Sequence, residues 1–134
     1  DFDKSELYLT AIGSSIESGD EGLVGRGNRI NGLIAPMRPM SMEGAAGKNP
    51  VYHIGKVYHV TANLMSKKIF EELGIPNEVF LVSQSGRDLF DPWIVHVNVT
   101  KDVNENVIRK IVEDSLKEIP NITEGILNNL YTIY

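Results

Sequence analysis

Apolar residues recur at helical spacing through the middle of the chain. They are separated by three or four positions, which places them on one face of an amphipathic helix, and we predict that helix over residues 50–73. Asn49 is a suitable N-cap and Pro50 suits the first helical position. Gly74 is the residue type that commonly ends a helix, and Pro76 follows it. The apolar positions are Ile54, Val57, Tyr58, Thr61, Leu64, Met65, Ile69 and Leu73.

Four β-prone segments flank this helix, two on each side. Residues 7–12 read as a buried strand, residues 14–28 as a loop, and residues 29–35 as a second short strand. Residues 78–83 and 93–100 are also predicted strands, and in the second of them apolar residues alternate. The connection between them contains Ser85, Gly86, Arg87 and Asp88, which favours a long antiparallel hairpin.

A second amphipathic helix is predicted over residues 104–119, where Pro120 should break it. Asn121 is then expected to cap a short final helix at 123–130. The order strand, strand, helix, strand, strand, helix predicts an α+β fold, with helices on one face of a largely antiparallel sheet. A chain of 134 residues is the size of a single domain.

Composition excludes several classes of protein. The net charge of −5 argues against a general nucleic-acid binder, and no stretch approaches the roughly 20 apolar residues of a membrane span. The absence of cysteine excludes disulfides and thiolate metal sites, and it fits a cytoplasmic protein. Because the chain begins with Asp1 and not Met, we expect a trimmed or internal piece of a longer protein.

Basic and glycine residues concentrate in one segment. Residues 25–56 hold five Arg or Lys and one Glu, as well as six of the twelve glycines. Small residues at 44–47 let a backbone approach a ligand closely, and Lys48 precedes the expected helix start. This pattern favours a phosphate or carboxylate site, and a solvated loop or a tight structural turn is the alternative. The long loop at 36–50 is expected to be mobile without ligand.

Two common phosphate-binding motifs do not fit this segment. A Walker loop needs Gly where Met42 stands and Ser or Thr where Asn49 stands. A dinucleotide fingerprint beginning at Gly25 needs its third glycine where Ile30 stands. The sequence therefore indicates neither a Walker NTPase nor a Rossmann domain.

A longer phrase in the same segment carries a family resemblance. Residues 25–36, 38–43 and 46–50, with His53, Gly55 and Lys56, resemble the signature stretch of archaeal S-adenosylmethionine synthetases. The resemblance is dense from Tyr8 to about Leu64 and looser beyond. It implies the C-terminal portion of an enzyme built from three similar α+β units.

The resemblance also implies an activity. Such enzymes make S-adenosylmethionine, pyrophosphate and phosphate from ATP, L-methionine and water, they need Mg²⁺ and are helped by K⁺, and they work as homodimers. Partners would therefore be ATP, methionine, triphosphate, a second subunit and the remainder of the same chain. The isolated piece is expected not to turn over. The competing hypothesis is a non-catalytic anion-binding or assembly module whose basic loop docks on an acidic partner.

Individual roles follow from the same resemblance. Asp20 matches the aspartate that holds the amino group of methionine, and Arg26 aligns with a phosphate-contacting arginine. Gly27 stands where bacterial and eukaryotic members have lysine, so Arg29 is the candidate to replace that charge. Lys48 matches the lysine of the family's phosphate loop, in which Gly47 and Asn49 are its neighbours.

Two family positions are not matched. Tyr52 replaces a second lysine, and Lys56, one helical turn further on, is the candidate substitute. Ile54 stands at the position of a Mg²⁺-binding aspartate, so the metal ligands are unknown and are expected elsewhere in the enzyme. His53 is a candidate to hydrogen-bond phosphate, and a structural histidine is the alternative.

Overall fold

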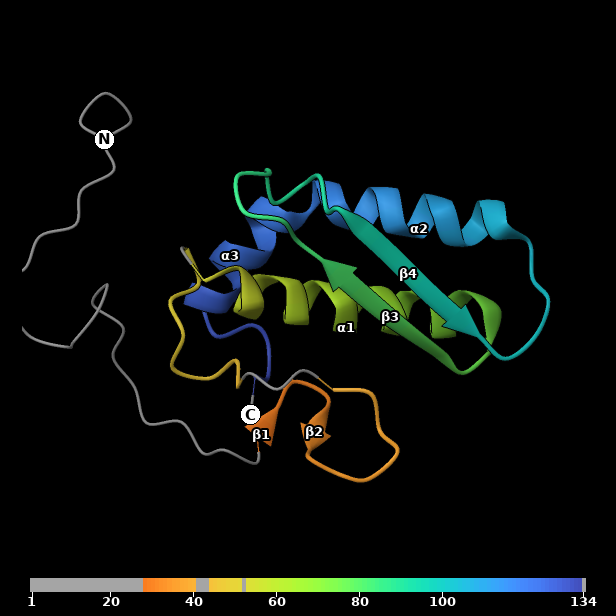
Figure 1. Cartoon of the computed structure of the whole chain (residues 1–134), viewed down its shortest axis with the longest axis horizontal. Coiled ribbons are helices and arrows are strands. Elements are labelled where there is room, and N and C mark those ends of the chain that lie inside the picture. The colour runs from red at the N-terminus through yellow and green to blue at the C-terminus, as the bar shows by residue number, and fades with distance from the viewer. Residues whose placement is uncertain (1–27, 41–43, 52, 134) are drawn as a thin grey trace, which may run out of the picture.

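The computed structural model of the chain describes residues 28–40, 44–51 and 53–133 and shows an α+β fold (Figure 1). This confirms the predicted class, although the strand expected at 7–12 lies outside the described residues. Pairing is antiparallel throughout, in two separate two-stranded sheets within this part of the chain. In chain order the elements are β1 (Asn28–Arg29), β2 (Gly32–Leu33), α1 (Ile54–Leu73), β3 (Asn77–Val82), β4 (Ile94–Val99), α2 (Glu105–Lys117) and α3 (Ile119–Leu127).

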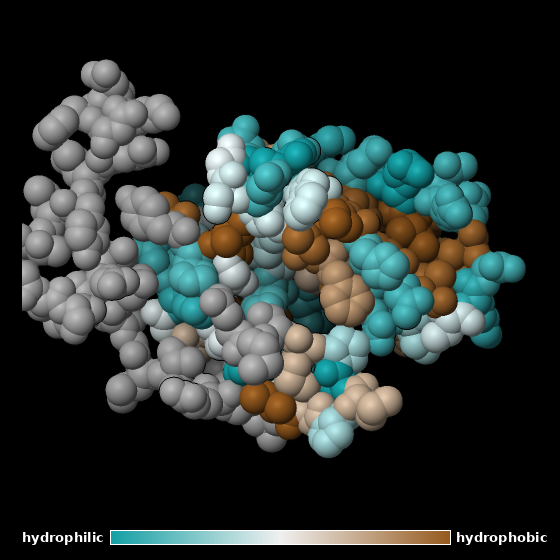
Figure 2. All heavy atoms as spheres, viewed as in Figure 1, coloured by the Kyte–Doolittle hydropathy of each residue, from teal (hydrophilic) through white to brown (hydrophobic). Residues whose placement is uncertain are grey.

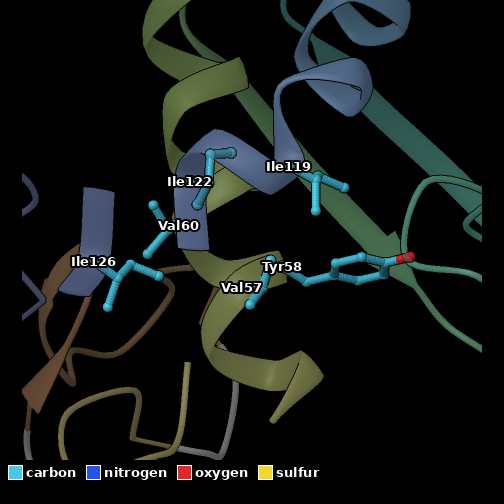
Figure 3. Close-up of a cluster of buried hydrophobic side chains, with 6 residues drawn as sticks. All are labelled: Val57, Tyr58, Val60, Ile119, Ile122 and Ile126. Atoms are coloured by element: carbon cyan, nitrogen blue, oxygen red, sulfur yellow. The ribbon is translucent and has the colours of Figure 1, made fainter. Parts of the chain in front are cut away.

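Helix α1 is the centre of the fold, and β3, α2 and α3 all pack against it. Its predicted apolar face is buried, with Met65 and Ile69 fully inaccessible to solvent. Near its start, Val57, Tyr58 and Val60 of α1 form the main apolar cluster with three isoleucines of α3 (Figure 3). The isoleucines are Ile119, Ile122 and Ile126.

The two ends of α1 differ in how well the sequence predicts them. At the C-terminal end Gly74 has a φ of 65°, and its N–H donates to the Phe70 carbonyl at 2.8 Å, as expected of a helix-ending glycine. At the N-terminal end the prediction is wrong, because α1 begins at Ile54 and not at Pro50. His53 is the N-cap residue, and its side chain makes no capping hydrogen bond.

Asn49 caps a separate turn instead of the helix. Its Oδ1 accepts from the Val51 N–H at 2.8 Å, and its carbonyl accepts from the His53 N–H at 3.0 Å. One helical turn therefore forms before α1. The Thr123 hydroxyl of α3 lies 3.5 Å from the Pro50 carbonyl and ties this turn to the core.

The predicted long hairpin is present as β3 and β4. Asn77 lies opposite Val99 and Val82 opposite Ile94, so all six residues of each strand are paired. Alternate side chains face away from the helices. His96 is one of them, is exposed, and has its ring centroid 6.0 Å from that of Phe80. Apolar groups also reach the surface over this hairpin (Figure 2), because Phe80, Val82 and Ile94 are exposed.

The single strand expected at 29–35 is a small hairpin instead. The chain turns at Ile30 and Asn31, so that Arg29 pairs with Gly32. Gly32 has a φ of 108°, and a Cβ at this position would lie 3.0 Å from Nη1 of Arg38. Gly32, which can adopt a positive φ, therefore determines the local structure of this segment more than its apolar composition does.

The C-terminal helices also depart from the prediction at their junction. Helix α2 begins after Asn104, whose Oδ1 accepts from the Asn106 N–H at 3.1 Å. Pro120 does not separate two helices by a loop but occupies the first turn of α3, and Asn121 lies inside α3 and does not cap it. Proline is tolerated in a first turn because its missing N–H would have no partner there.

Candidate functional site: a lysine cluster before helix α1

A tight turn precedes the helix. The Lys48 N–H donates to the Ala45 carbonyl at 3.3 Å, and Gly47 in the third position of the turn has a φ of 78°. A positive φ at that position alone is the pattern of a type II turn, which favours glycine. Ala45 is 1% exposed, so the turn is anchored on the protein body. The tight structural turn, which was one of the two sequence-based alternatives, is thus present.

Three of the predicted site residues meet at this turn. The Lys48 Nζ lies 3.3 Å from Nε2 of His53, and the Lys56 Nζ donates to the Lys48 carbonyl at 2.6 Å. An ammonium group only donates, so the His53 Nε2 accepts in the first of these contacts. We refer to Lys48, His53 and Lys56 as the lysine cluster. Gly47 and Asn49 shape the two turns that carry it.

The members of the cluster differ in accessibility. Lys56 is 6% exposed, whereas Lys48 and His53 are partly exposed. Lys48 is therefore the more accessible residue of the two lysines. This difference could not be read from the sequence, in which both lysines lie in the same basic segment.

A groove of about 770 Å³ borders the start of α1 on another side. The β1–β2 segment, α1 and β3 line it, and Arg29, Arg38, Ile54, Tyr58, His59 and Phe80 are among its residues. Arg29 is 7% exposed and is thus largely enclosed by its neighbours. The described part of the chain places Arg29 in this groove, while the lysine cluster does not line it. Asp20 and Arg26, the other two predicted site residues, lie outside the described residues.

Tyr58 connects the start of α1 to the hairpin. Its hydroxyl donates to the Leu89 carbonyl at 2.9 Å. Burial raises the pKa of Tyr58 above its usual 10.0, and the negative charge of Asp91 raises it further, while Arg87 acts in the opposite sense. Tyr58 is therefore a neutral hydrogen-bond donor at physiological pH.

The donor set at the turn suits an anion. Lys48 and Lys56 are cationic and cannot ligate a metal ion while protonated. Within the residues that the structure describes, no three His, Asp or Glu side chains gather as metal ligands. The lysine cluster therefore fits phosphate oxygens, and its two ammonium groups do not themselves hold Mg²⁺.

Sequence reasoning missed two contributors to this region. Thr123 reaches the Pro50 carbonyl from 73 residues away in the chain, and no local pattern signals such a contact. Arg38 lies in the resembling phrase, yet its packing against Gly32 depends on the β1–β2 turn. No local sequence pattern signals the second contact either.

Comparison with known proteins identifies the family. The family model described as S-adenosylmethionine synthetase (AdoMet synthetase) matches residues 1–130, so the chain belongs to this family. It is 48% identical over 130 residues to an S-adenosylmethionine synthase of Aeropyrum pernix, a match covering 96% of this chain and 31% of the relative.

Two further relatives agree. A probable S-adenosylmethionine synthase of Aquifex aeolicus is 43% identical over 139 residues, covering 99% of this chain and 35% of the relative. An S-adenosylmethionine synthase of Saccharolobus islandicus is 46% identical over 140 residues, covering 98% and 35%. The chain thus spans about a third of the length of these relatives. No helix in the described residues has the length and apolar character needed to cross a membrane.

Proposed function

We propose that this chain supplies the triphosphate-binding loop of a methionine adenosyltransferase. The reaction converts ATP, L-methionine and water into S-adenosylmethionine, pyrophosphate and phosphate. One observation carries the proposal: the lysine cluster sits on a glycine turn at the start of α1, in a member of the S-adenosylmethionine synthetase family. The protein is proposed to be a cytoplasmic homodimeric enzyme, of which this chain is the C-terminal α+β unit.

The chemistry explains why cationic groups are needed. The sulfur lone pair of methionine attacks C5′ of ATP, and the bond from C5′ to the triphosphate oxygen breaks with its electron pair. The sulfur has no proton to lose, so this step needs no general base. Charge builds up on the leaving triphosphate, and fixed positive groups lower the barrier by stabilising it. Water then cleaves the triphosphate into pyrophosphate and phosphate.

Roles for individual residues follow within this proposal. Lys48 is the described cation best placed to contact triphosphate, because it is a partly exposed lysine that directly follows Gly47 in the turn. His53 accepts a hydrogen bond from the Lys48 ammonium and so helps to hold it beside the turn. Asn49 holds the backbone of the loop, and Arg29 offers a further cation from the groove. Asp20 and Arg26 are proposed to bind the methionine amino group and phosphate.

Metal ions enter this proposal only with the substrate. Mg²⁺ would arrive bound to phosphate oxygens and neutralise part of their charge, with ligands from outside the described residues. K⁺ is the expected activator. A unit that is a third of the enzyme is proposed to lack turnover by itself, so the decisive assay on this chain is a binding assay.

The first test is the affinity of the chain for inorganic tripolyphosphate in the presence of Mg²⁺, measured by calorimetry. Replacing Lys48 with Ala is expected to weaken binding by about 1.5–3 kcal/mol, the range for a hydrogen bond to a charged group. Lys67→Ala is the matched control, because Lys67 is an exposed lysine of α1 and lies outside the lysine cluster. Equal affinity in the wild type and Lys48→Ala, or no binding by the wild type, would contradict the role given to this loop. Binding of an acidic protein partner without tripolyphosphate would instead favour the assembly module.

A further inference from the structure

Lys56 is a buried lysine in the first turn of α1, and its side chain runs back toward the preceding loop. Side chains of a helix lean toward its N-terminus, which brings the Lys56 Nζ to 2.6 Å from the Lys48 carbonyl. Only 6% of Lys56 is exposed. A buried ammonium is costly unless it is hydrogen-bonded, so this contact holds both partners firmly.

Three hydrogen bonds close a ring through the lysine cluster. Lys56 donates from Nζ to the Lys48 carbonyl, and Lys48 donates from Nζ to the His53 ring at 3.3 Å. The backbone N–H of Lys56 donates to the His53 carbonyl at 3.1 Å. The position of the Lys48 ammonium therefore depends on where Lys56 holds the Lys48 backbone.

We propose that Lys56 is a positioning residue, which fixes the peptide following the Gly47 turn and thereby aims the Lys48 ammonium at the triphosphate. This inference rests on the proposed function of Lys48. It assigns Lys56 a different role from direct phosphate contact, the role suggested by its place in the sequence. The turn itself is closed by a longer bond, 3.3 Å from the Lys48 N–H to the Ala45 carbonyl. The shorter, charge-assisted bond from Lys56 is the stronger restraint on the loop.

The distribution of charge at the start of α1 favours the binding of an anion. The N-terminal end of a helix carries a partial positive charge, which disfavours nearby cations. The first turn of α1 contains no acidic residue, and Lys56 adds a positive charge there. The helix end and the two lysines therefore bring positive charge to this part of the molecule, and positive charge attracts an anion.

The first experiment needs no ligand. NMR spectra of the wild type, Lys56→Met and Lys67→Met are compared, the last being a matched loss of an exposed lysine on the same helix. The carbonyl carbon of Lys48 reports directly on the hydrogen bond that it accepts. We expect the Lys48 carbonyl and the Gly47 and Lys48 amides to shift in Lys56→Met and to stay in place in Lys67→Met. Unchanged loop resonances in a folded Lys56→Met protein would overturn the proposal.

The second experiment separates positioning from direct contact. Affinity for Mg²⁺–tripolyphosphate is measured in the wild type, Lys48→Ala, Lys56→Met and the double variant. Lys56→Met is expected to bind about tenfold more weakly, equivalent to one charged hydrogen bond. In the Lys48→Ala background the same change should have almost no further effect.

The outcomes of this cycle are distinguishable. Independent, additive losses would mean that Lys56 contacts the anion itself, and this would overturn the positioning role. An affinity unaffected by Lys48→Ala would instead remove the proposed function of the loop. The ligand-free spectra would still decide whether Lys56 fixes the turn.

Discussion

The two ends of α1 are fixed by different kinds of interaction. At the C-terminal end, Gly74 adopts a φ of 65° and donates to the Phe70 carbonyl within its own helix. At the N-terminal end, the N-cap residue His53 makes no side-chain capping bond, and the loop before it is held by Lys56 and Thr123. A local rule therefore sets one end, and contacts between distant residues set the other. The end that depends on tertiary contacts is the one that carries the candidate site.

Helix α2 provides a reference within the same molecule. Asn104 and Asn49 make the same local bond, in which Oδ1 accepts the backbone N–H two residues later, at 3.1 and 2.8 Å. Helix α2 begins at the next residue, whereas α1 begins only at Ile54. In a continuous helix the Pro50 carbonyl would accept from the Ile54 N–H, but it faces the Thr123 hydroxyl. The same capping residue thus starts a helix in one context and a separate turn in the other.

The largest expected effect is at the locally determined end. Gly74→Ala should lower the free energy of unfolding by about 1–2 kcal/mol, the cost of placing a Cβ in the left-handed region. A Cβ at Gly74 would meet no atom within 4 Å, so the loss reports backbone strain alone. Urea unfolding measures it, and tripolyphosphate affinity should stay unchanged. An unfolding free energy equal to that of the wild type would remove the contrast between the two ends.

A pair of asparagine variants sharpens the comparison. Asn104→Ala should cost about 1 kcal/mol of stability, the usual value for a lost N-cap, and leave Mg²⁺–tripolyphosphate binding intact. Asn49→Ala should do the opposite, with a smaller loss of stability and weaker binding, because it loosens the turn that follows Lys48 and leads to His53. Urea unfolding and calorimetry on both variants provide the test. Identical behaviour of the two variants would mean that the Asn49 turn is no more than a displaced helix cap.

The smallest effect concerns the tie between Tyr58 and the hairpin. Tyr58→Phe removes the hydrogen bond to the Leu89 carbonyl and should cost about 0.5–1.5 kcal/mol at neutral pH. The pKa of Tyr58 is raised in the folded state above 10.0, so the folded protein keeps this proton at a pH where the unfolded chain loses it. Stability from Tyr58 is therefore complete below pH 10 and is lost as the pH rises through the raised pKa.

The measurement for this prediction is urea unfolding of the wild type and Tyr58→Phe between pH 7 and pH 11. The advantage of the wild type should shrink above pH 10. The other tyrosines are the same in both proteins, so the difference between the two unfolding free energies isolates Tyr58. A constant difference across this range would show that burial does not raise the pKa of Tyr58.

Sequence patterns predicted the regular elements well where local rules decide. The apolar face of α1, its end at Gly74 and the pairing of β3 with β4 are all as expected. The errors lie at three junctions: the start of α1, the turn at Ile30 and Asn31, and the passage from α2 to α3. Each junction contains a proline or glycine that is compatible with two local conformations, and packing selects one of them. These residues are Pro50, Gly32 and Pro120.

The candidate site divides in the same way. Lys48, His53 and Lys56 were found from residue type and from resemblance, and the family comparison supports the resemblance. Their separate positions were not predictable, because the sequence does not show that Lys56 is buried while Lys48 is partly exposed. The placement of Arg29 in a groove away from the cluster was equally hidden.

The sequence by itself determined the α+β class, the long central helix and the concentration of positive charge before it. These follow from periodicity, capping residues and composition, which act over a few neighbouring positions. Only the tertiary structure decided where α1 begins, which lysine is buried and which carbonyl it binds. Those choices depend on groups up to 73 residues apart, such as Thr123 and Pro50, whose hydrogen bonds form only after the helices have packed.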